Sequence, residues 1–232
     1  LQISTIYNQK MKNKSKFSRF FIEPINDKVL IIYAKGTFAY LNDKLEKKIF
    51  SNYSSELSGA QIMGSMIHEQ NLFISYKWSE NKKTNSLINN DLKKSKQKDK
   101  AQNCYYLKIA KASLKKKELL FEEIYKTNDC KDRISGGKMS VLKSSLGILL
   151  STDAQFEFKN LAQDPKSSFG KIMLINLEDY KYKVFSSGHR NPMGLFVQDN
   201  LILETEHGPC GGDEINLIKK DKNYGWPKMS MG

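Results

Sequence analysis

The sequence has little arginine and no long apolar run. Among 38 basic residues, the only arginines are Arg19, Arg133 and Arg190. Arginine recognises phosphates and bases through two parallel hydrogen bonds, whereas lysine provides a solvated point charge. The net charge of +13 therefore indicates a lysine-rich surface. Charge is the only argument for a nucleic-acid partner, so no such partner is expected. No run of about 18 apolar residues is present, so no membrane span is predicted.

Cysteine is also scarce. Cys104, Cys130 and Cys210 show no CxxC motif and no metal-ligand spacing, and an odd number cannot form a closed disulfide framework. A Cys104–Cys130 bridge is compatible with export, but the sequence does not require it. The chain begins with Leu1 and lacks the order of a signal peptide, so we expect either a removed leader or a piece of a longer protein. Residues 1–16 are polar and basic and are predicted to form an N-terminal lead-in segment.

Four pairs of short apolar segments, separated by Asn, Asp or Ser, indicate β-hairpins. The pairs are 20–22 with 29–33, 63–67 with 72–76, 138–142 with 147–151, and 194–197 with 201–205. Further strands are expected at 37–41, 104–110, 171–177 and 214–219, with outer candidates at 119–125 and 182–185. Residues 113–124 fit a helix or a turn plus strand equally well. Residues 79–103 are predicted to be a polar surface insertion.

The recurring unit of about four strands predicts an all-β chain, and its length favours a β-propeller over a sandwich. We expect about the first three to four blades of a partial propeller over residues 17–232. Glycine and proline are densest in residues 188–227. This window reads G-H-R-N-P-M-G-L from 188, E-H-G-P-C-G-G-D-E-I-N from 206 and N-Y-G-W-P from 223. Such a segment is typical of a rigid, site-forming loop.

These motifs resemble the signature of the soluble quinoprotein glucose/sorbosone dehydrogenase family, G-x-R-N-P-Q-G-L, E-H-G-P-x-G-G-D-E-x-N and N-Y-G-W-P. The segments A-Q-D at 162–164, S-G-G-K-M at 135–139 and T-D at 152–153 extend the similarity upstream. The resemblance implies a six-bladed propeller that oxidises the C1 hydroxyl of aldose sugars by hydride transfer to pyrroloquinoline quinone (PQQ), assisted by calcium. It also implies a periplasmic or secreted location and an external electron acceptor.

The resemblance assigns roles to individual residues. The backbone carbonyls of Gly208 and Pro209 would bind calcium, a hard cation that takes oxygen ligands. Arg190 and Asn191 would contact the quinone, and His207 would line the cofactor pocket. The Arg190 guanidinium would also act catalytically, because it would stabilise negative charge as hydride arrives.

One departure concerns the general base. The family's histidine two positions before Gly-Gly is Ile134 here, and isoleucine cannot accept a proton. Asp153, which matches the acid that orients this histidine, is retained as a catalytic candidate. Asp213, Glu214 and His189 are expected to be structural. Two hypotheses follow: a sugar dehydrogenase whose base comes from elsewhere, or a catalytically impaired propeller that binds sugar or a protein partner.

Overall fold

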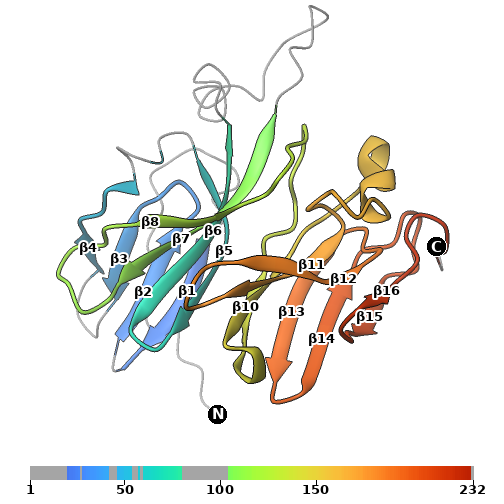
Figure 1. The fold of residues 1–232 in the computed structure, drawn as a ribbon. Coiled ribbons are helices and arrows are strands. Elements are labelled where there is room, and N and C mark those ends of the chain that lie inside the picture. Colours follow the sequence, from blue (N-terminus) through green and yellow to red (C-terminus); the bar gives the residue numbers. More distant parts are fainter. Residues whose placement is uncertain are drawn as a thin grey trace, which may run out of the picture.

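The computed structural model describes residues 20–26, 28–41, 46–53, 57, 60–79 and 104–230. Their regular structure is almost entirely β-strand, arranged in four sheets that stand side by side as the blades of a propeller (Figure 1). This confirms the predicted all-β propeller. The predicted lead-in segment 1–16 and residues 80–103 of the predicted insertion lie outside the described residues. No helix in the described ranges is long and apolar enough to cross a bilayer.

Each blade is an antiparallel sheet that follows chain order. Blade one contains β1 (Phe20–Ile25), β2 (Lys28–Tyr33), β3 (Phe38–Leu41) and β4 (Glu46–Ile49). Blade two contains β5 (Gln61–His68), β6 (Asn71–Ser79), β7 (Tyr105–Ser113) and β8 (Glu122–Lys126). Blade three contains β9 (Met139–Leu142), β10 (Gly147–Ser151), β11 (Lys171–Asn176) and β12 (Tyr182–Ser187), and β16 (Lys222–Asn223) joins β12 in parallel. Blade four contains β13 (Pro192–Gln198), β14 (Leu201–Glu206) and β15 (Glu214–Leu217).

All four predicted hairpins are present, as β1–β2, β5–β6, β9–β10 and β13–β14. Residues 113–124 contain the end of β7, a turn and the start of β8 rather than a helix, because the chain reverses there and Glu122 pairs with Lys111 of β7. The predicted start of the insertion at Ser79 was wrong. Strand β6 includes Ser79, whose backbone is in register with Tyr105 of β7. Blade three also contains two short 3-10 helices, η1 (Lys143–Ser145) and η2 (Phe156–Ala162).

The hydrophobic core lies between neighbouring blades. Alternate residues of β6 face different neighbours: Phe73 packs in the cluster shared with blade three, and Ile74 in the cluster shared with blade one. In β10, Leu150 faces blade two while Leu149 faces blade four. Successive side chains of a strand point to opposite faces, so a strand covered on both sides is apolar throughout. The packing of blades therefore explains the continuous apolar run at residues 147–150.

Cys104 and Cys130 form a disulfide, with their Cα atoms 5.2 Å apart, whereas Cys210 is free and exposed. Next to the bridge, Tyr105 and Lys131 exchange two backbone hydrogen bonds of 2.9 and 3.0 Å. The bridge and this backbone pair together fix the segment after β8 against the start of β7.

Candidate functional site

The loops of the Gly- and Pro-rich window that carry the predicted site residues lie at one end of blades three and four, the end toward which β14 runs (Figure 1). Arg190 and Asn191 lie between β12 and β13, and His207 directly follows β14. The His207 N–H donates to the Asn191 carbonyl at 3.2 Å, and Arg190 Nη1 donates to the His207 carbonyl at 2.7 Å. The structure thus brings together the three residues predicted to bind the cofactor.

Glu206, the last residue of β14, holds these loops in place. Its carboxylate accepts hydrogen bonds from the backbone N–H groups of Arg190 and Asn191, the latter at 3.1 Å. The other carboxylate oxygen lies 3.3 Å from Nδ1 of His189. The motif contained Glu206, but sequence reasoning gave it no role, because its partners lie on a different strand connection.

A second buried carboxylate, Glu204, lies behind Glu206. Burial, together with the charge of Glu206, raises the pKa of Glu204 to about 8. His189 is fully buried, bonded through Nε2 to Ser186 at 2.8 Å and stacked on Tyr224, which fits its expected structural role. The donor atoms of His189, Glu204 and Glu206 lie within 4.8 Å of one another, a spacing that a metal ion would also tolerate. Protein donors already occupy one oxygen of Glu206, so we interpret the group as a hydrogen-bonded support for the loops.

Besides Oε1 of Glu204 behind the loops, two buried polar atoms at the site have no hydrogen-bond partner among the described residues: Nε of Arg190 and Oδ1 of Asn191. Buried polar groups are nearly always paired, and an unpaired one costs about 1–3 kcal/mol. The Arg190 guanidinium also lies 5.3 Å from the centre of the Trp226 ring. A pocket opens here, lined by Gly188, Arg190, Glu206, His207, Gly208, Glu214, Tyr224, Trp226, Met229 and Ser230. Nε of Arg190, a residue that lines this pocket, would donate to a polar, planar ligand such as the expected quinone, so the residues present fit it.

The turn that carries Gly208 and Pro209 is tight and is pinned by Asp213. The Asp213 carboxylate accepts the Gly208 N–H at 3.0 Å and lies 3.1 Å from His207 Nδ1, and these two interactions lower its pKa. A Cβ on Gly208 would come within 1.8 Å of the Gly211 carbonyl oxygen. The structural role expected for Asp213 is therefore observed. A stiff turn that presents carbonyl oxygens suits calcium, so the donor chemistry fits this ion as well.

Asp153 is buried under the Gly-Gly loop and forms an ion pair with Lys131. Lys131 Nζ lies 2.5 Å from Asp153 Oδ2, and both side chains are only 1% exposed. Asp153 also accepts the N–H groups of Ser135 at 2.9 Å and Gly136 at 3.2 Å. Burial acts to raise the pKa of Asp153, but the charge of Lys131 and the hydrogen bonds from Lys131, Ser135 and Gln155 together lower it. Sequence reasoning missed Lys131, because it lies outside every recognised motif.

Ile134, at the position of the family's base, is 6% exposed and packs in the core between blades two and three. The described structure therefore places an apolar core side chain where a base was sought. The catalytic role suggested for Asp153 stays a prediction.

Antiparallel blades with a polar loop site at one end define a β-propeller protein. The chain belongs to the Glucose / Sorbosone dehydrogenase family, whose model matches residues 26–232.

Relatives with curated names match over shorter segments. The chain is 38% identical over 80 residues to quinoprotein glucose dehydrogenase B of Acinetobacter calcoaceticus, covering 29% of this chain and 17% of that protein. It is 48% identical over 52 residues to aldose sugar dehydrogenase YliI of Escherichia coli, covering 22% of this chain and 14% of that protein.

Among solved structures, the fold is similar to the soluble aldose sugar dehydrogenase of E. coli in its apo-form, with a TM-score of 0.63 and 17% identity over 91% of this chain. It is also similar to the PQQ-bound form of aldose sugar dehydrogenase from Streptomyces coelicolor, with a TM-score of 0.61 and 18% identity over 90% of this chain. At such identities the likeness concerns the fold alone. The chain spans 62% of each of these two structures.

Proposed function

We propose that this chain forms the cofactor-holding part of a PQQ- and calcium-dependent aldose dehydrogenase. The observation that carries the proposal is the pair of unpartnered buried atoms, Nε of Arg190 and Oδ1 of Asn191, beside the pinned turn at Gly208. Membership of the sugar dehydrogenase family supports the same conclusion. An aldose sugar would be the substrate, and an external acceptor would remove the electrons.

The residues of the site would have distinct roles in binding and catalysis. Arg190, Asn191 and His207 would hold the quinone, and the carbonyls of Gly208 and Pro209 would hold calcium. When bound, PQQ supplies a two-electron acceptor for hydride from the sugar C1, and calcium supplies positive charge beside it. The guanidinium of Arg190 is fixed by the His207 carbonyl and would stabilise negative charge without reorganising. Such preorganised electrostatic stabilisation is usually the largest single contribution to catalysis.

A second candidate function is a catalytically impaired propeller that binds sugar or a protein partner. Two observations favour it. Ile134 is buried in the core, and Lys131 neutralises Asp153 so that its carboxylate is engaged in a structural ion pair. In this case Asp153 would position the Ser135–Gly136 backbone and would take no part in proton transfer.

A periplasmic or secreted location is part of the proposal. The Cys104–Cys130 disulfide supports it, since such bridges persist in oxidising compartments and are rare in the cytosol.

The test is reconstitution of the full-length protein with PQQ and calcium, followed by two measurements. Cofactor affinity is measured by calorimetry, and aldose oxidation is followed with an artificial electron acceptor. Arg190→Lys, which keeps the charge but loses the planar fork, should weaken PQQ binding roughly tenfold or more. Lys183→Gln, which removes one exposed cation elsewhere on blade three, is the matched control and should bind as the wild type does.

The outcomes separate the two candidates. Tight cofactor binding with turnover supports the dehydrogenase, and tight binding without turnover supports the impaired propeller. Failure to bind PQQ in the presence of calcium refutes the cofactor site, and with it the enzyme.

A further inference from the structure

Beside the cofactor site, four side chains form a row in which aromatic rings and guanidinium groups alternate. From the Arg190 Cζ, the centre of the Trp226 ring lies 5.3 Å away and that of the Phe156 ring 6.0 Å away. The Arg133 Cζ lies 5.7 Å from the same Phe156 ring. The row therefore leads from the predicted quinone residue Arg190 outward to Arg133.

Phe156 is exposed where an apolar side chain would ordinarily be buried. Its exposed fraction is 56%, and its backbone is left-handed, with φ of 51°. A bulky residue in this region is strained, and such strain persists where the surroundings fix it, often at ligand-binding sites. Here the chain two residues earlier is fixed, because the Ala154 N–H donates to the Arg190 carbonyl at 2.8 Å and the Trp226 indole donates to the Ala154 carbonyl at 2.7 Å. The ring is thus presented to solvent by a rigid frame.

Arg133 is the exposed cation of the row, with 66% of its side chain accessible. Its closest acidic partner, Asp132, is 3.9 Å away, a long and solvent-screened pair that contributes little. Glu157, next to Phe156, is exposed and forms no ion pair with Arg133 in the part of the chain described. The planar fork of Arg133 is therefore available, and this geometry matches a carboxylate or a phosphate.

We propose that Phe156 and Arg133 form a substrate subsite for an aldose that carries a carboxylate or phosphate group remote from C1. The apolar face of the sugar ring packs on Phe156, and the anionic group pairs with Arg133 while C1 is directed toward Arg190. This inference rests on the proposed function, because it names the substrate class of the same site. The net charge of +13 would also attract an anionic sugar to the protein.

The experiment compares glucose, glucuronate and glucose 6-phosphate on the full-length protein. Binding of each sugar is measured by calorimetry without cofactors, and kcat and KM are measured after loading with PQQ and calcium. We expect one of the two anionic sugars to bind roughly tenfold more tightly than glucose. Glucuronate preference identifies a carboxylate subsite, and glucose 6-phosphate preference identifies a phosphate subsite.

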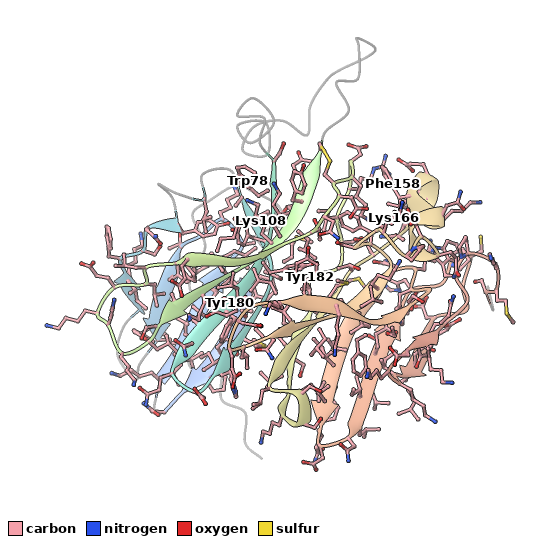
Figure 2. The ribbon with its side chains drawn as sticks, in the orientation of Figure 1. Trp78, Lys108, Phe158, Lys166, Tyr180 and Tyr182 are labelled. Atoms are coloured by element: carbon pink, nitrogen blue, oxygen red, sulfur yellow. A yellow bond between two sulfur atoms is a disulfide. The ribbon has the colours of Figure 1, made fainter. Side chains whose placement is uncertain are left out.

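Four variants test which side chains cause the preference for the anionic sugar. Arg133→Gln should abolish the preference for the anionic sugar over glucose, and Arg133→Lys should restore it only in part. Phe156→Ala should weaken binding of all three sugars. Lys166→Gln removes one exposed cation at the same end of the molecule, where Figure 2 labels it, and should leave the preference intact.

Equal binding of the three sugars, or a preference that survives in Arg133→Gln, would overturn the inference. Turnover without any anionic preference would refute the subsite and leave the proposed dehydrogenase standing. A preference in the binding measurement without turnover would support the subsite and count against the dehydrogenase.

Discussion

Replacing Lys131 by methionine tests how much the buried ion pair under the Gly-Gly loop stabilises the fold. The substitution keeps the apolar stem and removes the charge 2.5 Å from Asp153. The carboxylate would keep its hydrogen bonds from Ser135 and Gly136 but would be left as an uncompensated charge, 1% exposed. Removing one partner of a buried pair costs about 3–5 kcal/mol. That is a large part of the roughly 5–15 kcal/mol by which folded proteins are stable.

The measurement is urea unfolding of the full-length protein at neutral pH, followed by circular dichroism. Lys181→Met is the matched control, because Lys181 forms an exposed pair with Asp179 and has 85% of its side chain accessible. It should leave the midpoint of urea unfolding unchanged. In the double variant Lys131→Met with Asp153→Asn, the cost should be clearly smaller than the sum of the two single costs.

The free energy of unfolding at acid pH should also depend on the Lys131–Asp153 pair. The pKa of Asp153 is lower in the folded protein than its ordinary value of 3.8, so the folded state holds fewer protons near that pH. The stabilisation is therefore complete above this pH and is lost as the pH falls through the lower, folded pKa. Asp153→Asn should remove this acid dependence. A cost below about 1 kcal/mol for Lys131→Met, or additive costs in the double variant, would refute the reasoning.

Two further predictions concern the disulfide and the carboxylate behind the loops. Replacing Cys104 and Cys130 together by serine removes a crosslink between residues that lie 26 positions apart in the chain. The free energy of unfolding should fall by about 2–4 kcal/mol. Urea unfolding without reductant measures this change, and an unchanged midpoint would contradict the prediction. The pKa of Glu204 is raised from its ordinary 4.5 to about 8, so the folded state retains a proton in this range and stability should fall as pH rises through it. Glu204→Gln should flatten this part of the stability–pH curve, and a curve that keeps the wild-type slope would be inconsistent with a proton on Glu204.

The sequence by itself determined the strands and the position along the chain of the proposed cofactor residues. Apolar segments divided by turn residues predict hairpins because the strand period and the turn chemistry are local properties of the chain. The residues Arg190, Asn191, His207, Gly208 and Pro209 sit in short motifs that resemble the family signature, and the resemblance located them before the fold was known.

Only the tertiary structure decided what surrounds them. The Lys131–Asp153 pair spans 22 positions, and the contact of Arg133 with Phe156 joins the segment after β8 to the start of η2; neither has a local signal. Both depend on how the segment after β8 is held against blade three. The same packing places Ile134 in the core. A contact between segments far apart in the chain is set by the packing of whole blades, since no interaction among sequence neighbours requires it.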